Sequence, residues 1–458
     1  MSAALAMAGF RPFAGLRVAV LGLGRAGLPA ARALAGYGAD VVAWDDAADA
    51  RSGADVPVAD LGSGPFRFDA LLLSPGIPHH LPAPHPVATR ARDAGVPILT
   101  DAEFLFRAVR AAGSRARFAG ITGTNGKSTT TALLAHLLVA AGVTTAAGGN
   151  LGPAALSLPI LPDDGVYALE MSSYMLERLA TLRFDVAALL NLSSDHLDRH
   201  GDMAGYLLAK RHIFDRQRAD DVAILGQDDP WTRICSRGIA GRVVPVSGAS
   251  PALGGVWAEG TLLRDDGGPI ADLAACPALP GAHNAQNAAA AVAAATALGV
   301  SRAALGPALA SFAGLPHRQS LVATINGIRF VDDSKATNAD AAARAMGCYD
   351  RFVWIAGGIG KAGGIEALAP LFPRIARAVL IGRDAAEFAR TLAAAGIPHD
   401  VAGTLEAAVP RAFDAAARSG TPIVLLSPAA ASFDQFSGFE ARGRRFADLA
   451  RALDGRRA

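Results

Sequence analysis

The chain has 458 residues, of which 51% are hydrophobic and 18% are charged. This composition is typical of compact globular proteins and excludes wholesale disorder. The 43 Lys plus Arg residues nearly balance the 41 Asp plus Glu residues, so the net charge of +2 provides no broad basic surface for duplex nucleic acid. At about 150 residues per domain, the length suggests about three domains.

The cysteines and the N-terminal residues bear on the compartment. Cys235, Cys276 and Cys348 are far apart and form no CxxC or Cys/His cluster. This spacing argues against a disulfide framework or a zinc site and favours a reducing compartment. The first ten residues carry no basic segment of a signal peptide, and the apolar stretches are too short or too interrupted to span a bilayer. We therefore expect a cytoplasmic protein that binds neither nucleic acid nor membrane.

Two series of short β-branched runs alternate with helical stretches in the first two thirds of the chain. LRVAVLG, DVVAWD, DALLLSPG and VPILT lie between residue 16 and about residue 107. RFAGITG, VYALEMS, VAALLNLS and DVAILG follow, and an alanine-rich helix over 283–299 closes this series. Such alternation indicates parallel strands joined by crossover helices.

The last third predicts a further α/β unit. SLVATINGIRFVDD reads as a hairpin, and the strands FVWIAGG, AVLIG and IVLLSP are each followed by a helical segment. The fold prediction is therefore α/β with three domains. A Rossmann-like N-terminal domain would cover 1–108, a central P-loop ATPase-type domain 109–314, and a C-terminal Rossmann-like domain 315–458.

The first phosphate-binding candidate follows the first predicted strand. Gly22-Leu-Gly24-Arg25-Ala26-Gly27 leads into a helix, and Asp45 ends the next strand, which matches the dinucleotide fingerprint. The pattern places a phosphate at a helix N-terminus, and either NAD or a UDP pyrophosphate satisfies it. The segment Ser74-Pro75-Gly76 would face the same crevice, where it would contact a base or sugar or form a plain turn.

A stronger phosphate signal follows a later strand. In Gly120-Ile-Thr-Gly-Thr-Asn-Gly-Lys127-Ser128-Thr129, backbone N–H groups at a helix N-terminus would surround phosphates. Lys127 would reach the β and γ phosphates, and the Ser128 hydroxyl would face Mg²⁺. The spacing departs from the usual pattern, because Ile121 occupies the position of the first glycine; the alternative is a glycine-rich turn.

Metal-ligand candidates lie after the next strands. Glu170 ends the strand VYALE, and the cluster Asp195-His196-Leu-Asp198-Arg199-His200 follows VAALLNLS. Carboxyl ends of parallel strands meet at one edge, so these side chains would collect beside the phosphate loop. Mg²⁺ prefers a few carboxylates plus water. Lys210, in the helix YLLAKRHIF, is by sequence alone most often a solvated charge.

Further polar groups follow the later strands and open the alanine-rich helix. Asn284 and Asn287 lie one turn apart, where they would bind an adenine edge or cap the helix. The groups past the strands of the third unit are His317-Arg318, Asp332 to Asn338, Gly357 to Lys361, and Ser427 to Asp434. Taken together, they predict an active-site face.

These motifs, in this order, resemble the Mur ligases of peptidoglycan synthesis over nearly the whole chain. The motifs are GLGRAG, SPG, GITGTNGKST, GGN, LEMSS, DHLDRHG, LPGAHNAQN, GLPHR, DDSKATNADAA, GGIGK and SPAAASFDQF. The pair DSKATN and SPAAASFDQF is specific to the members that add D-glutamate to UDP-N-acetylmuramoyl-L-alanine. The resemblance implies a first domain that holds the UDP end, a central domain that holds ATP and two Mg²⁺ ions, and a third domain that brings the amino acid.

The resemblance also implies roles for individual residues. The catalytic set is Lys127, Glu170, His196 and Lys210, and the metal set is Ser128, Glu170, His196 and a carboxylated Lys210. The ATP set is Gly123, Thr124, Asn125, Gly126, Lys127, Ser128, Thr129, Asn284, Asn287, Arg318 and Asp333. The UDP-substrate set is Gly24, Arg25, Ala26, Asp45, Ser74, Pro75, Gly76, Asn150 and His196. The D-glutamate set is Lys335, Thr337, Lys361, Ser432, Phe433 and Phe439.

Two departures and three alternatives accompany this interpretation. Gln319-Ser320 stands where an acidic residue is expected two positions after Arg318, and Asp46-Ala47 replaces the usual Thr and Arg after Asp45. The alternatives are an NAD-linked oxidoreductase, a nucleotide-gated binding protein without amide-forming activity, and a sister ligase for another amino acid such as L-alanine. We expect the protein to act as a monomer.

Overall fold

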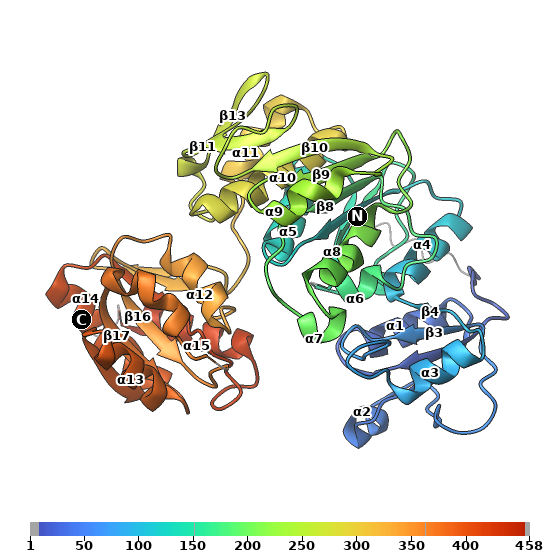
Figure 1. Cartoon of the computed structure of the whole chain (residues 1–458), viewed down its shortest axis with the longest axis horizontal. Helices are drawn as coiled ribbons and strands as arrows, with labels where there is room; N and C mark the ends of the chain where they lie inside the picture. The colour runs from blue at the N-terminus through green and yellow to red at the C-terminus, as the bar shows by residue number, and fades with distance from the viewer. Residues whose placement is uncertain (1–8, 151, 362, 454–458) are drawn as a thin grey trace. The chain divides into compact units, whose positions relative to one another are not determined.

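The structure is a computed structural model that describes residues 9–150, 152–361 and 363–453. The chain forms two compact units: the first runs to Cys276 and includes Ala282–Phe312, and the second contains Pro277–Gly281 and the residues from Ala313 onward. Three sheets with flanking helices confirm the α/β prediction (Figure 1). The proposed boundaries at 108 and 314 stay a prediction.

The first sheet is parallel and has the strand order β2-β1-β3-β4. Its strands are β1 (Arg17–Leu21), β2 (Asp40–Trp44), β3 (Ala70–Leu73) and β4 (Ile98–Leu99). Its helices are α1 (Gly27–Gly36), α2 (Ala48–Ser52), α3 (Pro86–Asp93) and α4 (Asp101–Ala111). Strand β2 lies on one side of β1, and the chain then crosses over to place β3 on the other side of β1. The carboxyl ends of β1 and β3 therefore form a switch point, where open α/β sheets bind ligands.

The second sheet has nine strands in the order β13-β12-β11-β10-β9-β8-β5-β7-β6. The strands are β5 (Arg117–Thr122), β6 (Thr145–Gly149), β7 (Val166–Glu170), β8 (Val186–Leu189), β9 (Val222–Gly226), β10 (Arg242–Ser247), β11 (Val256–Glu259), β12 (Leu262–Asp265) and β13 (Gly268–Asp272). Strands β5 to β11 run parallel, and β12 and β13 are antiparallel. Because β5 lies between β7 and β8, the loops after these three strands meet at one edge.

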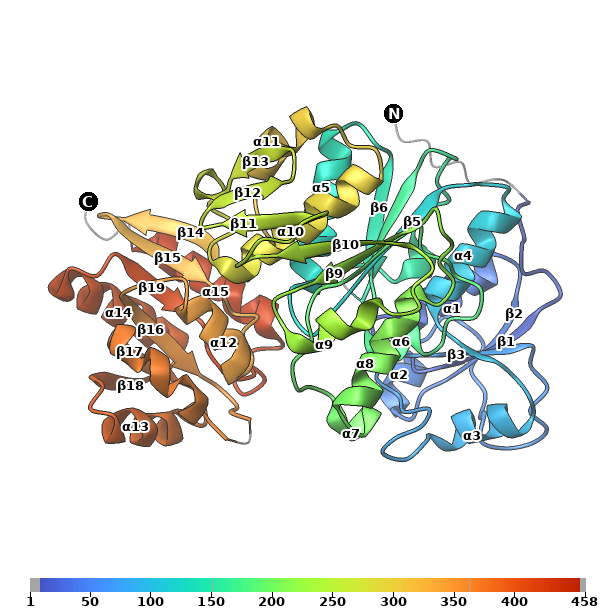
Figure 2. The same ribbon diagram turned by 45° about the horizontal axis from the view of Figure 1, so that its top comes forward.

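Helices cover the second sheet and bury its central strands. They are α5 (Lys127–Ala140), α6 (Ser173–Leu176), α7 (Leu197–His200), α8 (Met203–Arg211), α9 (Pro230–Arg233), α10 (Ala282–Ala297) and α11 (Arg302–Ala310). Strands β7, β8 and β9 are buried along their whole length, as expected for parallel strands covered on both faces. Ala288 to Ala291 of α10 are fully buried, which lets this helix pack closely on α5 and on β9 to β11 (Figure 2).

The second unit contains a sheet with the strand order β14-β15-β19-β16-β17-β18. Its strands are β14 (Ser320–Ile325), β15 (Ile328–Asp332), β16 (Phe352–Gly357), β17 (Ile375–Ile381), β18 (His399–Gly403) and β19 (Ile423–Leu426). Its helices are α12 (Ala339–Met346), α13 (Ala385–Ala394), α14 (Leu405–Ser419) and α15 (Phe439–Ala452). The predicted hairpin is confirmed, since β14 and β15 are antiparallel and the turn residues Asn326 and Gly327 both have positive φ. None of the helices in the described parts of the chain has the length and apolar character needed to cross a membrane.

A buried carboxylate joins α4 to the segment after α6 in the first unit. Glu103 is 0% exposed and accepts hydrogen bonds from the backbone N–H groups of Ala180, Thr181 and Leu182 at 2.9 to 3.0 Å. Arg107, one turn along α4, lies 2.9 Å away. Burial by itself raises the pKa of Glu103, but these hydrogen bonds, with the Thr181 hydroxyl first, outweigh it and hold the pKa below its usual value.

We expect Glu103→Gln to lower the free energy of unfolding by about 2 kcal/mol at neutral pH, because a neutral amide accepts hydrogen bonds more weakly and adds a donor among donors. A lowered folded-state pKa stabilises the fold above the unfolded pKa of about 4.3, and this stabilisation disappears as the pH falls through the folded value. Urea unfolding at pH 7 and at lower pH measures the difference. Wild type and variant should converge in acid; a constant difference would contradict this account.

Candidate functional site

The predicted phosphate loop connects β5 to the N-terminus of α5. Gly123 and Gly126 have φ of +149° and +82°, which only glycine adopts readily, so their positions in the motif follow from the backbone path. Lys127 folds back over the loop and donates to the carbonyl oxygens of Gly123 at 3.0 Å and Thr124 at 2.8 Å. The loop thus presents a helix N-terminus and a lysine at one place, as an anion-binding site requires.

Helix α10 packs directly on this loop through its two asparagines. Asn287 is 2% exposed, and its Oδ1 would lie 2.1 Å from a Cβ atom at Gly126, so only glycine fits there. Thr130 donates to Asn287 Oδ1 at 3.3 Å, and Asn287 Nδ2 donates to Asn284 Oδ1 at 3.0 Å. Both side chains are buried at the loop, and whether they bind an adenine edge or cap the helix stays a prediction.

Asn191, which the sequence interpretation did not single out, clamps the phosphate loop from the end of β8. Its Oδ1 accepts from the Asn125 N–H at 2.9 Å, and its Nδ2 donates to the Asn125 carbonyl at 3.1 Å. The same Nδ2 donates to Gln286 Oε1 of α10 at 3.1 Å, and the Asn191 carbonyl accepts from the Thr124 N–H at 2.9 Å. The sequence does mark this residue, because Asn191 is a polar residue at the end of an apolar strand, shortly before the polar cluster 195–200.

Glu170 ends β7 beside the loop, and its carboxylate is buried. Glu170 is 2% exposed, and its Oε1 accepts a hydrogen bond from Asn150 Nδ2 at 2.7 Å. The other oxygen, Oε2, is buried without a hydrogen-bond partner. A buried carboxylate oxygen without a donor is costly, and a metal ion satisfies it. The sequence prediction placed Glu170 at this edge correctly.

Lys210 lies on α8 and is 1% exposed, so it is not the solvated charge that its sequence context favours. Its Nζ lies 4.6 Å from the centre of the Tyr206 ring. Burial, and then the positive charge of Lys127, hold the pKa of Lys210 well below its usual value, although Asp195 and Glu170 oppose this shift. A lowered pKa increases the fraction of a lysine that is in the neutral, nucleophilic form.

The cluster after β8 adopts a strained backbone. His196 has φ of +53°, an uncommon conformation for a residue with a Cβ, and caps the short helix α7. Its ring lies 5.2 Å from the ring of Tyr174, and its Nε2 lies 3.5 Å from Asp195 Oδ2. Burial lowers the pKa of His196, so the neutral form that can ligate a metal is favoured. His200 instead bonds Ser173 Oγ at 2.9 Å.

The dinucleotide fingerprint forms a tight loop at the switch point of the first sheet. A Cβ at Gly27 would lie 1.7 Å from the Gly22 carbonyl, whereas a Cβ at Gly24 would meet nothing within 4 Å. The exposed middle of the loop, Gly24 to Ala26, is therefore open to a ligand. Asp45 uses its carboxylate within the protein, since it accepts from the N–H groups of Leu23 and Ala47 at 2.7 and 2.9 Å. Asp45 thus shapes the loop.

The turn Ser74-Pro75-Gly76 follows β3 and faces the same switch point. Ser74 Oγ donates to the Gly22 carbonyl at 3.0 Å, which ties the turn to the fingerprint loop. Asp46, which stands with Ala47 in place of the usual Thr and Arg after Asp45, makes contacts of its own. Asp46 lies 3.0 Å from His85 Nε2, and Arg51 donates to the Asp46 carbonyl at 2.8 Å.

In the second unit, the predicted nucleotide residues lie around a buried carboxylate. Asp333 follows β15, is 7% exposed and accepts from the Ser427 hydroxyl at 2.7 Å. Burial raises the pKa of Asp333 to about 7, against the opposing effects of Ser427 and Arg318. Arg318 lies between two residues of positive φ, His317 at +63° and Gln319 at +51°. His317 Nδ1 is held 2.6 Å from Asp332 Oδ2.

The predicted D-glutamate residues gather past β15, β16 and β19, which are neighbours in this sheet. Lys335 Nζ lies 3.9 Å from the centre of the Phe439 ring, and Ser432 is buried at 2% exposure. Thr337 donates its N–H to the Lys335 carbonyl at 2.9 Å. The remaining two members, Lys361 and Phe433, are exposed. Where an acidic residue is expected after Arg318, Ser320 donates its hydroxyl to the Leu315 carbonyl at 2.7 Å.

Arg442 holds these loops together and was missed in the sequence. It lies on α15, is 1% exposed and donates through Nη2 to the carbonyls of Ser334 at 2.9 Å and Ala430 at 3.1 Å. Its Nε donates to Ser334 Oγ at 2.9 Å, and Nη1 to the Gly357 carbonyl at 3.4 Å. Burial lowers its pKa to about 10. Only the fold brings three carbonyls from three loops to one guanidinium, so no local pattern marks this residue.

Comparison with known proteins identifies the family. Residues 121–295 match the Mur ligase middle domain, and residues 317–430 match the Mur ligase glutamate ligase domain. The UDP-N-acetylmuramoylalanine--D-glutamate ligase of Paramagnetospirillum magneticum is 49% identical over 96% of this chain and 97% of its own length. The enzyme of the same name from Caulobacter vibrioides is 49% identical over 95% of this chain and 96% of its own.

Solved structures share the fold at low identity. UDP-N-acetylmuramate-alanine ligase of Thermotoga maritima has a TM-score of 0.59 and 18% identity, over 96% of this chain and 100% of its own. MurF ligase of Thermotoga maritima, in complex with ADP, has a TM-score of 0.55 and 20% identity, over 79% and 86% of the two chains. With relatives that are 49% identical along nearly its whole length, the chain belongs to the Mur ligase family.

Proposed function

We propose that this protein is the ATP-dependent ligase that joins D-glutamate to UDP-N-acetylmuramoyl-L-alanine during the synthesis of peptidoglycan precursors, and that it works as a cytoplasmic monomer. The observation that carries the proposal is one edge of the second sheet. There the phosphate loop, a buried carboxylate oxygen without a donor and a buried lysine lie together, in a chain whose full-length relatives bear the name of this ligase. The alternative of an NAD-linked oxidoreductase does not account for the groups at this edge.

The residues at this edge fit Mg²⁺. Glu170 Oε2 would ligate the ion, with the Ser128 hydroxyl and His196 as further ligands. Among the residues that the structure describes, no three His, Cys, Asp or Glu side chains are clustered for a metal. Lys210 would supply the missing anionic oxygens as a carbamate, because its lowered pKa favours the neutral amine that can add carbon dioxide, whereas an ammonium cannot ligate a cation. When bound, two Mg²⁺ ions would neutralise phosphate charge during transfer.

The reaction needs positioning more than covalent chemistry from the protein. A carboxylate oxygen of the terminal alanine attacks the γ-phosphorus of ATP, the bond to ADP breaks, and an acyl phosphate forms. The amine of D-glutamate then attacks the acyl carbon, phosphate leaves with the electron pair of its C–O bond, and the amine loses a proton. Lys127 would leave the loop carbonyls to follow the β and γ phosphates. Asn150 and His196 would face the muramoyl end.

The remaining predicted sets supply the three ligands. Backbone from Gly123 to Thr129, with Asn284 and Asn287 from α10 and with Arg318 and Asp333 from the second unit, would bind ATP. Gly24 to Ala26 and the turn Ser74-Pro75-Gly76 would hold the UDP end, with Asp45 shaping the loop. The D-glutamate set is Lys335, Thr337, Lys361, Ser432, Phe433 and Phe439. A cationic Lys335 and Lys361 suit an amino acid with a second carboxylate.

The deciding measurement is phosphate release from Mg-ATP with UDP-N-acetylmuramoyl-L-alanine in the presence of D-glutamate, L-glutamate, L-alanine or no amino acid. We expect only D-glutamate to drive stoichiometric phosphate release and to yield a heavier UDP product by mass spectrometry. Turnover driven by another amino acid would move the protein to a sister ligase. Phosphate release that no amino acid accelerates would favour a nucleotide-gated binding protein.

Lys210 gives a sharper test of the metal site. We expect activity to fall in buffer depleted of carbon dioxide and to return on adding bicarbonate, because the carbamate forms reversibly from the neutral amine. Lys210→Arg keeps a long basic side chain but cannot form the carbamate, and should lose about 100-fold or more in activity. A ¹³C carbamate signal from labelled bicarbonate should appear in wild type alone. An active Lys210→Arg variant would refute the carbamate.

Substitution of Asn191 tests the hydrogen bonds that hold the phosphate loop. In Asn191→Asp, a carboxylate replaces the amide that donates to Asn125 and Gln286, so two buried acceptors face an anion. We expect KM for ATP to rise about tenfold while KM for the UDP substrate changes little. Asn326→Asp makes the same chemical change on the exposed hairpin turn of the second unit and should leave both values unchanged. Equal rises in both KM values would contradict an effect confined to the phosphate loop.

A further inference from the structure

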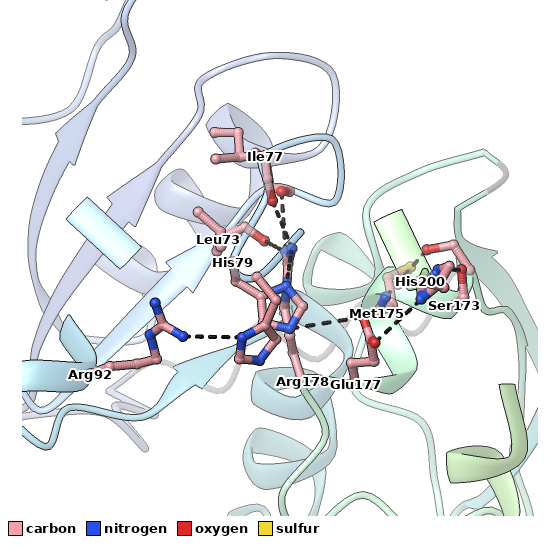
Figure 3. A network of polar contacts seen from close by, with 12 residues as sticks. Leu73, Ile77, His79, Arg92, Ser173, Met175, Glu177, Arg178 and His200 are labelled. Atoms are coloured by element: carbon pink, nitrogen blue, oxygen red, sulfur yellow. Dashed lines mark hydrogen bonds and ion pairs between the residues drawn. The ribbon is translucent and has the colours of Figure 1, made fainter. Parts of the chain in front are cut away.

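Arg178 is a buried arginine that no predicted set contains, and it holds the turn after β3 from below (Figure 3). It follows α6 and is 2% exposed. Nη1 donates to the carbonyl oxygens of Leu73 at 2.9 Å and Ser74 at 3.2 Å, and Nη2 donates to that of Ile77 at 2.8 Å. One guanidinium therefore fixes the backbone on both sides of Pro75 and Gly76.

A buried histidine completes the arginine's set of acceptors. His79 Nδ1 lies 3.2 Å from Arg178 Nη2, and the histidine is 7% exposed. Burial first, and then the positive charge of Arg178, lower the pKa of His79 to about 3, so the ring stays neutral and Nδ1 remains an acceptor. Each acceptor lies in the segment 73–79, which is the segment that closes the switch point of the first sheet.

The same contacts connect the turn to the fingerprint loop. Ser74 donates to the Gly22 carbonyl, and a Cβ at Gly22 would lie 2.6 Å from Ser74 Oγ and 2.9 Å from Ile77 Cδ1. With no free space between turn and loop, a shift of the turn displaces the loop. The position of Arg178 therefore sets the width of the crevice in which the UDP end would lie.

On its other side, Arg178 is continuous with the cluster that carries His196. The preceding residue, Glu177, lies 3.8 Å from His79 Nε2 and 3.4 Å from His200 Nδ1 (Figure 3). From the same cluster, Arg199 donates to the Gly76 carbonyl at 3.0 Å while its guanidinium lies 4.4 Å from the centre of the Tyr174 ring. Two arginines of the second sheet's loops thus bind the carbonyls of one turn of the first sheet.

We propose that Arg178 is a positioning residue for the UDP-linked substrate: it presets the turn 73–77 against the fingerprint loop and holds both in register with the His196 cluster. The inference rests on the proposed function for the identity of that substrate. A planar fork with five donors can serve four separated acceptors, whereas the ammonium of a lysine is a single point of charge. Arg178→Lys would leave buried carbonyls without donors and let the turn move.

The test compares KM for UDP-N-acetylmuramoyl-L-alanine, ATP and D-glutamate in wild type and Arg178→Lys. We expect KM for the UDP substrate to rise about tenfold while KM for ATP changes less than about twofold, since the phosphate loop is held by Asn191 and not by Arg178. Titration calorimetry with UDP-N-acetylmuramoyl-L-alanine alone should show the same loss of affinity without turnover. His79→Ala removes one of the four acceptors and should give a smaller change of the same kind.

Glu103→Gln is the matched control, because Glu103 anchors residues 180–182 of the same segment but does not touch the turn. It should lower the melting temperature and leave all three KM values unchanged. If Arg178→Lys lowers the melting temperature as Glu103→Gln does, with KM for the UDP substrate unaltered, the role is structural and the proposal is overturned. If Arg178→Lys is too unstable to assay, an unaltered affinity in His79→Ala overturns it. Wild-type protein without ligase activity would instead refute the proposed function.

Discussion

Parallel strands end at one edge of a sheet, and everything else in the site depends on this constraint. Because β7, β5 and β8 are neighbours, the phosphate loop, Glu170 and the His196 cluster are brought to one place from segments far apart in the chain. The loops there turn sharply, and their carbonyl and N–H groups lie where little water reaches them. Each loop therefore needs a buried partner for its backbone, and these partners define the shape of the site.

Buried and half-buried polar side chains meet that need in both units. Asn191 pairs with both backbone groups of Asn125, and Glu103 accepts three successive N–H groups. Arg178 and Arg442 act as donors instead: each is almost fully buried, Arg178 donates to several carbonyls of one turn, and Arg442 donates to carbonyls of three segments. A charge without water is unfavourable, and burial lowers the pKa of both arginines. The hydrogen bonds that both arginines donate offset this cost and fix the position of the backbone at these two places.

Burial also affects Lys210 and Glu170. Removal from water disfavours the charged lysine, and the nearby charge of Lys127 disfavours it further. The lowered pKa favours the neutral amine of Lys210, and Oε2 of Glu170, whose charge acts on Lys210, is buried without a hydrogen-bond partner. A site that is unfavourable as a set of protein groups alone is thus suited to cations and phosphates.

The sequence by itself determined the α/β character of the strands and helices that form the three sheets, the hairpin at Asn326-Gly327 and the place of Glu170, because these follow from local periodicity and from where strands end. It also located the two glycine-rich turns that follow β1 and β5, since glycine positions follow from backbone angles. The tertiary structure alone decided the burial of Lys210 and the internal use of Asp45. It alone revealed Arg178, whose acceptors lie about a hundred residues away. Such partners have no fixed spacing, so no sequence pattern encodes them.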